Sequence, residues 1–327
     1  MLPGMAVSLI CLVILFYFAD IRKLGEALRL ANYRLVTLAV IATLVWLSVR
    51  GIVWRTLLQE QASFYQIFLT LNEGYLLNNV LPFRLGELGR AYLLGRKVNL
   101  SFFQVLSSII IERSLDVAMA VGIVFCTLPF VVGADWAGRA ALAAGGMVML
   151  VFIVLFLVAR NRLKVMAIFE NLTRRWPWLL RLGGKALPAL FDGLEVLNNP
   201  RRFIAAVGWM AGNWLVAIVQ YNLYVAAFFP QSEWLWGAFG LGVVALGVAA
   251  PSSPGSVGVL ELALVGGLSL FGADPSTALG CAITIHFFQY LSTGLLGAYG
   301  LSQDGETLGS LYRSIRNLRS NDIQKEP

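Results

Sequence analysis

The chain has 327 residues, of which 58% are hydrophobic and only 13% are charged, and its mean hydropathy is +0.74. A soluble domain carries roughly 25% charged residues, so this composition excludes the soluble classes of protein. The hydrophobic residues gather in long runs instead of the short alternating segments of a membrane β-barrel. The sequence therefore predicts an all-α polytopic membrane protein.

In chain order, some of these runs are long enough to be interpreted as full spans, and two others end at a break rich in proline and glycine. The predicted full spans are Met5–Ala19, Leu35–Trp54, Phe103–Val132, Ala140–Ala159, Phe203–Phe229 and Ala278–Leu301. The interrupted stretches are Phe64–Leu81 and Trp234–Ala250. Each is followed by a second arm too short for a full crossing, Leu85–Arg96 in the first case and Ser256–Phe271 in the second.

The first break reads "NNVLPFRLGELGR". A proline that ends one helix and glycines that begin another leave free N–H groups at the new helix N-terminus, where the helix dipole favours an anion. Arg84 lies beside that N-terminus, and Glu87 is three residues from both Arg84 and Arg90, so the three share roughly one face. We expect this break to bind substrate through Asn78, Asn79, Arg84, Glu87 and Arg90.

Charged residues also occur inside the next span, in "SSIIIERSLDVAMA". A charge at the bilayer centre costs about 2.5 kcal/mol or more, so such residues pair with each other or line a wet cavity. Glu112, Arg113 and Asp116 are therefore expected to face the interior and to contact the charges of the first break. We assign Arg113 to substrate binding and the two carboxylates to coupling or gating, with purely structural ion pairs as the alternative.

The second break reads "PSSPGSVGVLE". Ser252, Ser253 and Ser256 offer hydroxyl groups for substrate binding, or act as helix N-caps. Glu261 in the following arm and His286 in the last span are candidates for coupling or gating, although an interhelical hydrogen bond is the simpler role for this histidine. The single histidine and three separated cysteines predict no metal site.

The two breaks divide the chain into two similar halves. When Pro82 is aligned with Pro251, the offset of 169 residues also brings Leu35 close to Phe203. We predict halves of about 1–133 and 134–302, each with three spans and a re-entrant hairpin, the second half inverted. Paired breaks of this kind indicate a transport site near the midplane. An arrangement in which both arms of each break cross fully, with about nine crossings, is the alternative.

Basic residues indicate the orientation of the chain. The stretch from Ala159 to Arg202 holds nine Lys or Arg against three acidic residues, whereas Phe203 to Tyr312 contains no Lys or Arg. The positive-inside rule places the loop 160–202 and the tail 303–327 in the cytoplasm, as in a multi-pass protein of the cell membrane. The net charge of +7 is thus a topology signal and an attraction to lipid headgroups, and predicts no nucleic-acid binding.

Three motifs in this order, "NNVLPFRLGELGRAYLL", "SSIIIERSLDVAM" and "PSSPGSVGVLE", resemble the transmembrane family of lysylphosphatidylglycerol synthase, which includes the flippase domain of the multiple peptide resistance factor. The resemblance runs from about Leu35 to Leu301 and implies a membrane lipid translocase. It points to these motif positions: Asn79, Pro82, Arg84, Gly86, Glu87, Arg90, Glu112, Arg113, Asp116, Pro254, Gly255, Gly258 and Glu261. The soluble aminoacyl-transferring domain is absent from the sequence, so lysyl-lipid synthesis is not expected.

These observations favour a flippase or scramblase that moves a phosphate-bearing membrane lipid between leaflets, with no cofactor. The alternative is an intramembrane enzyme acting on a polyprenyl-phosphate or phospholipid substrate, for which the sequence lacks clustered ligands and a nucleotide-binding loop. A scaffold would not need the intramembrane charges. A homo-oligomer is left open, and uphill transport would require coupling to protons or ions.

Overall fold

The computed structural model describes residues 2–81, 85–132, 199–249, 253–311 and 313, together with isolated helical residues between 139 and 167. Among these residues every regular element is a helix. The predicted span Ala140–Ala159 is described only at isolated positions, and most of the loop 160–202 and of the tail 303–327 lies outside the described residues. The all-helical class predicted from the composition is confirmed.

The N-terminal region contains one helix that the hydropathy pattern did not indicate. Helices α1 (Leu2–Phe18) and α3 (Tyr33–Leu57) match predicted apolar runs, and α2 (Ile21–Leu30) lies between them with no buried residue. The Asp20 carboxylate begins α2 by accepting hydrogen bonds from the N–H groups of Arg22 and Lys23. This basic segment is thus an exposed helix.

The first break lies between helices α4 (Phe64–Val80) and α5 (Leu85–Val98), and α6 (Phe102–Val132) follows. Ser63 and Gln66 form a reciprocal capping box at the start of α4, which fixes where this helix begins. Both arms of the break end within two residues of the predicted bounds. The first break as quoted above, residues 78–90, thus comprises the end of α4, residues 81–84 and the start of α5.

The second half begins with α10 (Pro200–Phe228), which Asn199 caps. Helix α11 (Trp234–Ala249) leads into the second break, residues 250–258, which contains the short 3₁₀ turn η3 (Pro254–Ser256). Helix α12 (Val259–Ser269) starts later than the predicted arm, because Gly255, Ser256 and Gly258 have positive φ and interrupt the helix. The last helix, α13 (Pro275–Gln303), starts at the cap formed by Asp274.

Within the described residues, four helices are long and apolar enough to cross a membrane, namely α3, α6, α10 and α13. The predicted N-terminal span corresponds to α1, whose 17 residues extend only about 25 Å at 1.5 Å per residue. That length falls short of a hydrocarbon core of about 30 Å, so α1 is not counted with the four.

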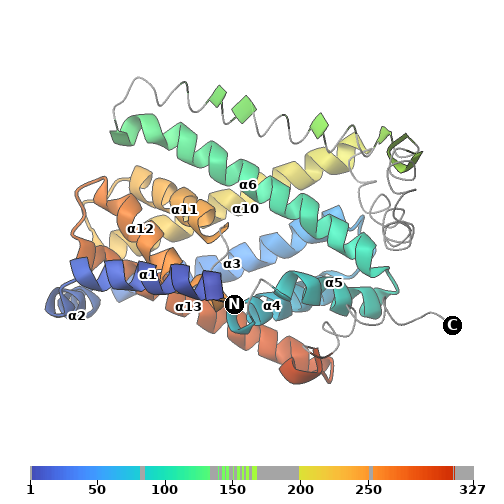
Figure 1. The fold of residues 1–327 in the computed structure, drawn as a ribbon, viewed down its shortest axis with the longest axis horizontal. Coiled ribbons are helices and arrows are strands. Elements are labelled where there is room, and N and C mark those ends of the chain that lie inside the picture. The colour runs from blue at the N-terminus through green and yellow to red at the C-terminus, as the bar shows by residue number, and fades with distance from the viewer. Residues whose placement is uncertain are drawn as a thin grey trace.

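The helices on either side of the two breaks pack reciprocally (Figure 1). Helix α3 packs along α10, which is its counterpart at an offset of 169 residues. Helix α4 packs against α13, and its counterpart α11 packs against α6. If α3–α6 are exchanged with their counterparts α10–α13, the α3–α10 contact maps onto itself. The α4–α13 contact maps onto the α6–α11 contact. In Figure 1 the α4–α5 and α11–α12 pairs lie at opposite sides of the molecule.

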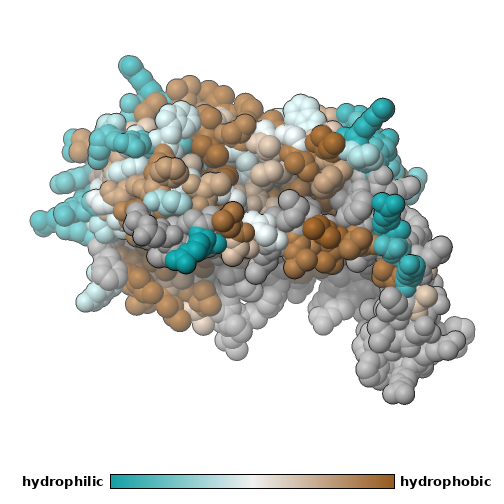
Figure 2. Space-filling view, turned by 90° about the horizontal axis from the view of Figure 1, so that it is seen from above, coloured by the Kyte–Doolittle hydropathy of each residue, from teal (hydrophilic) through white to brown (hydrophobic). Residues whose placement is uncertain are grey.

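The surface is that of a protein surrounded by lipid. Figure 2 shows hydrophobic residues over the middle of one face and hydrophilic residues gathered at its two ends. Large apolar side chains such as Leu38, Ile41, Leu215 and Leu295 are between 50% and 64% exposed. Contiguous apolar exposure of this kind is unfavourable in water and favourable against acyl chains.

Candidate functional site

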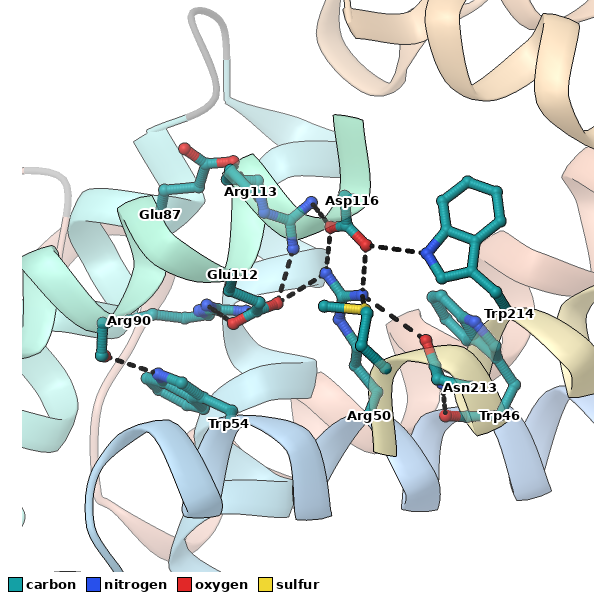
Figure 3. A network of polar contacts seen from close by, with 12 residues as sticks. Trp46, Arg50, Trp54, Glu87, Arg90, Glu112, Arg113, Asp116, Asn213 and Trp214 are labelled. Atoms are coloured by element: carbon teal, nitrogen blue, oxygen red, sulfur yellow. Dashed lines mark hydrogen bonds and ion pairs between the residues drawn. The ribbon is translucent and has the colours of Figure 1, made fainter. Parts of the chain in front are cut away.

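A cluster of charged side chains joins α3, α5 and α6 in the interior (Figure 3). Its centre is Glu112 of α6, which is fully buried. The Glu112 carboxylate accepts from Arg50 Nη2 of α3, Arg90 Nη2 of α5 and Arg113 Nη2 of α6, each at 2.7 Å. One carboxylate thus binds three guanidinium groups that come from three helices.

Arg50 was not selected from the sequence, although it lies inside an apolar run. Its guanidinium also donates to Asp116, from Nη1 to Oδ1 at 2.6 Å and from Nη2 to Oδ2. The Arg50 side chain is 2% exposed. The same nitrogen Nη1 is 3.5 Å from the Asn213 Oδ1 of α10. A charge within a long apolar run is the signal that could have identified this residue.

Aromatic residues enclose two of the arginine–carboxylate pairs. The guanidinium of Arg90 lies 4.2 Å from the centre of the Trp54 ring, a cation–π distance. On the other side, the indole N–H of Trp214 donates to Asp116 Oδ1 at 3.3 Å. Asn213 donates to the Trp46 carbonyl at 2.9 Å, which ties α10 to α3 beside the charges. The cluster is thus held rigidly on its buried sides.

The cluster is exposed at one edge, formed by Arg113, Glu87 and Asp116. Their side chains are 33%, 28% and 18% exposed, whereas those of Arg50 and Arg90 are 2% and 3% exposed. Arg113 Nε is 3.8 Å from Glu87 Oε1, and this nitrogen has no hydrogen-bond acceptor among the described residues. The longest ion pair of the cluster therefore joins its two most exposed side chains, although the Arg113 Nε itself is buried.

The charges of the cluster balance. The arginines and carboxylates that take part in it are Arg50, Arg90 and Arg113 against Glu87, Glu112 and Asp116. Because an unpaired charge in a low-dielectric interior is very costly, this balance is required for the cluster to be stable. An anion can enter only if a carboxylate moves away or takes up a proton.

The structure assigns partners to the first-break residues that differ from those expected from their spacing. Arg90 turns to Glu112, and Glu87 turns to Arg113, so the two do not form the pair suggested by their three-residue separation. Asn78 Oδ1 accepts from the Gly86 N–H at 2.8 Å, and Asn79 Nδ2 donates to Thr293 of α13 at 3.1 Å. Arg84 lies outside the described residues.

The carboxylate and histidine of the second half meet each other. Glu261 Oε1 lies 2.5 Å from His286 Nδ1, and Glu261 Oε2 accepts from the Gly258 N–H at 2.7 Å. His286 Nε2 lies 3.0 Å from the carbonyl oxygen of Gly255. The interhelical contact expected for His286 is present, and the same ring also contacts the turn at Gly255. These two residues lie on α12 and α13, while Glu112 and Asp116 lie on α6.

The serines of the second break contact the protein itself. The Ser253 N–H donates to the Ser8 hydroxyl of α1 at 3.1 Å, and the Ser253 hydroxyl donates to the Val257 carbonyl at 3.3 Å. The Ser256 N–H donates to the Ser253 carbonyl at 2.9 Å. Ser252 lies outside the described residues. No group of three or more metal-ligating side chains occurs in the described part of the chain.

Comparison with known proteins identifies the same type of membrane region along almost the whole chain. A family model described as "Lysylphosphatidylglycerol synthase TM region" matches residues 1–297. The chain is also similar to the "UPF0104 membrane protein MJ1078" of Methanocaldococcus jannaschii, with 25% identity over 232 residues, which cover 68% of this chain and 91% of that protein. No solved structure matches.

Proposed function

The chain belongs to the Lysylphosphatidylglycerol synthase TM region family, and from this premise we propose that it is a lipid translocase. It moves a phosphate-bearing lipid between the two leaflets of the cell membrane, with the headgroup at the charged cluster and the acyl or prenyl chains in the bilayer. The C-terminus is cytoplasmic, as the basic residues after Tyr312 favour.

The observation that carries this proposal is the position of Arg113. Its side chain is one-third exposed on a helix long and apolar enough to span a membrane, whereas the side chains of Arg50 and Arg90 are 2% and 3% exposed. Charged groups that only lock helices together are expected to be buried, as Arg50 and Glu112 are. Arg113 is instead available to an anion, and a guanidinium binds phosphate through two parallel hydrogen bonds.

While no lipid is bound, the Glu87 carboxylate lies beside Arg113 in the position that the phosphate would take. Its carboxylate approaches Arg113 Nε only to 3.8 Å and is 28% exposed, so it is displaced more easily than Glu112. Exchange of one anionic group for another preserves the charge balance of the cluster. In this mechanism Glu112 and Arg50 keep the site in shape, while Glu87 and Arg113 move.

The reciprocal packing supports a translocation pathway between two halves. If α3–α6 and α10–α13 are related by a two-fold axis in the membrane plane, each break faces the opposite leaflet, and the halves can exchange accessibility by rocking about the α3–α10 contact. This relationship and the re-entrant path of the breaks belong to the proposal.

Lipid translocation in reconstituted vesicles tests the proposal. Fluorescent phosphatidylglycerol is placed in the vesicles, and its movement between leaflets is followed by chemical quenching of the outer leaflet. We expect Arg113→Gln to slow translocation at least about tenfold, because the loss of one charge-assisted hydrogen bond costs about 1.5–3 kcal/mol. Arg113→Lys should recover only part of the activity, because lysine cannot bind phosphate through two parallel bonds.

The matched control is Arg96→Gln. Arg96 also lies on the α4–α6 side of the molecule, but it is exposed and pairs with Glu306. Equal rates for Arg113→Gln and wild-type protein would rule out phosphate binding by Arg113. Recovery of a chemically altered lipid from the vesicles would instead indicate the intramembrane enzyme that the sequence left as the alternative.

A further inference from the structure

The hydrogen bonds around His286 require more protons than a neutral imidazole carries. Its Nε2 faces the carbonyl oxygen of Gly255 and its Nδ1 faces the carboxylate of Glu261, at 3.0 and 2.5 Å. A carbonyl oxygen can only accept, so Nε2 must carry a proton. The contact at Nδ1 then requires a second proton, which belongs either to the imidazole ring or to Glu261.

Among the residues that the structure describes, no lysine or arginine is placed to share the charge of Glu261. Helices α11, α13 and α1 pack against α12, and none of the four contains a lysine or an arginine. Tyr221 of α10 and Tyr290 of α13 interact electrostatically with Glu261, and Cys11 of α1 lies beside Gly258; these phenols and this thiol are neutral near neutral pH. Glu261 is 7% exposed, so the proton it shares with His286 is what neutralises it.

The charged groups of α4, which packs on η3, are directed elsewhere. Glu73 pairs with Lys97, and Tyr75 interacts electrostatically with Arg50 and Arg113.

On α10, Arg202 lies at the start of the helix and donates to Gln59. On α2, Lys23 pairs with Asp274. On α3, Arg50 belongs to the cluster at Glu112. In the described part of the chain, no ion pair joins Glu261 or His286 to the arginine cluster.

Loss of the shared proton must open one of the two contacts. With one proton left, the imidazole either donates to Glu261 and turns a lone pair toward the Gly255 carbonyl, or does the reverse. A hydrogen bond to an ionised carboxylate is about twice as strong as one to a carbonyl. The bond to Glu261 is thus retained, and the contact between Nε2 and Gly255 is the one that opens.

We propose that Glu261 and His286 form a proton-binding site. When the proton is bound, His286 holds the turn at Gly255, and release of the proton frees this turn. This inference rests on the proposed function for its role, which is to couple proton exchange to lipid movement. A movement of this turn would be transmitted to the first half of the molecule. It packs against α4 of the first half, and α13, which carries His286, also binds the first break through Thr293 and Asn79.

Gly255 is closely packed against Tyr290 of α13. Its φ of 66° lies in the left-handed region, and a Cβ at this position would overlap the hydroxyl group of Tyr290. The Tyr290 ring is in turn 4.4 Å from the His286 ring. A turn this closely packed is held in one conformation as long as the His286 bond is present.

His286 is the only histidine in the chain, which allows a direct test. Isotope-labelled histidine in the full-length protein, reconstituted in phosphatidylglycerol nanodiscs, gives the nitrogen NMR signals of this single ring. We expect Nε2 to be protonated at low pH and, as the pH is raised, a single transition to a ring protonated at Nδ1 alone. A ring that keeps Nε2 protonated at every pH at which the protein stays folded would overturn the proton-binding site, whether or not the protein moves lipid.

Glu261→Gln provides the matched variant. A glutamine can accept from Gly258 and donate to Nδ1, so it imitates the protonated pair and cannot lose the proton. We expect its histidine signals to keep Nε2 protonated throughout the titration. Thr284→Val, which removes a hydroxyl group bonded only to its own helix at Gly280, should titrate like the wild-type protein.

Translocation at different pH values separates the coupling from the proposed function. Above the midpoint of the NMR transition, we expect the wild-type rate to fall about tenfold for each pH unit, as a step that requires one proton demands. Glu261→Gln should be at least about tenfold slower than wild type below the midpoint and insensitive to pH. If Glu261→Gln moves lipid as fast as the wild-type protein and with the same pH dependence, the coupling is wrong while translocation itself stands.

Discussion

Arg50 of α3 and Asp116 of α6 form a two-pronged ion pair, in which each terminal guanidinium nitrogen faces one carboxylate oxygen. The pair is buried on the side of Arg50 and 18% exposed on the side of Asp116. It fixes the rotation of α6 relative to α3. That rotation determines which side of α6 presents Arg113 to the first break.

Removal of Arg50 alone should be more damaging than removal of the whole pair. Arg50→Met leaves Glu112 and Asp116 with an excess of negative charge, and breaking a buried ion pair in this way costs about 3–5 kcal/mol. Arg50→Met combined with Asp116→Leu should cost less. The measurement is unfolding of the protein in mixed detergent micelles, followed by tryptophan fluorescence.

The control for this cycle is Arg55→Met, at the end of the same helix, where the guanidinium donates only to the carbonyl of Ala62. Its cost should be about 1 kcal/mol, the contribution of an ordinary hydrogen bond. Additive losses for Arg50 and Asp116 would show that the two residues do not interact.

Gly86 should tolerate no side chain, because α4 and α5 touch there through their backbones. A Cβ at Gly86 would overlap the carbonyl oxygen of Gly74 and lie 2.6 Å from Asn78 Oδ1. Gly86→Ala is expected to destabilise the protein by about 1–3 kcal/mol. Gly122→Ala, at a position with open space around it, should be neutral or slightly stabilising. The comparison of their unfolding midpoints measures how closely the first break is packed.

Lys97 pairs with two carboxylates that lie on different elements. Its Nζ lies 2.6 Å from Asp304 Oδ2 and 3.1 Å from Oε2 of the fully buried Glu73, which joins α5, α4 and the end of α13. Lys97→Met should destabilise by about 3–5 kcal/mol, because it leaves Glu73 unpaired. Adding Glu73→Gln should restore part of that loss. A double variant no more stable than Lys97→Met would contradict the interaction.

Helix positions could be predicted because the spans obey simple rules. Leu85–Arg96 and Phe103–Val132 were predicted within two residues of α5 and α6, since an apolar run and a glycine or proline boundary are local features. The exposed helix α2 was missed, because its apolar residues do not form a run. The start of α12 was misplaced, because Gly255 and Gly258 take positive φ values where they pack closely on α13 and α1, and such tertiary contacts are not visible in the sequence.

The pairing of the site residues could not be predicted from spacing. Glu87 and Arg90 are at a distance in sequence that favours contact on one helix, yet each finds its partner on α6. Tertiary packing decides such pairs, since a fully buried carboxylate such as Glu112 attracts every arginine within reach. Arg50 was overlooked because the search was centred on the breaks, although the same rule on intramembrane charge applies to it.

The last prediction concerns Glu87, which competes with the phosphate for Arg113. Glu87→Gln removes the competing charge, so the affinity of the protein for a phosphate-bearing lipid should rise by up to about fivefold, since a half-exposed ion pair contributes up to about 1 kcal/mol. Binding of short-chain phosphatidylglycerol to the purified protein in a neutral detergent measures this effect. Glu26→Gln on the exposed helix α2 is the control with the same change of charge, and its affinity should equal that of the wild-type protein. A lower affinity for Glu87→Gln would mean that Glu87 holds Arg113 in the binding conformation and does not compete with the phosphate. An unchanged affinity would place the lipid phosphate away from the contact between Glu87 and Arg113.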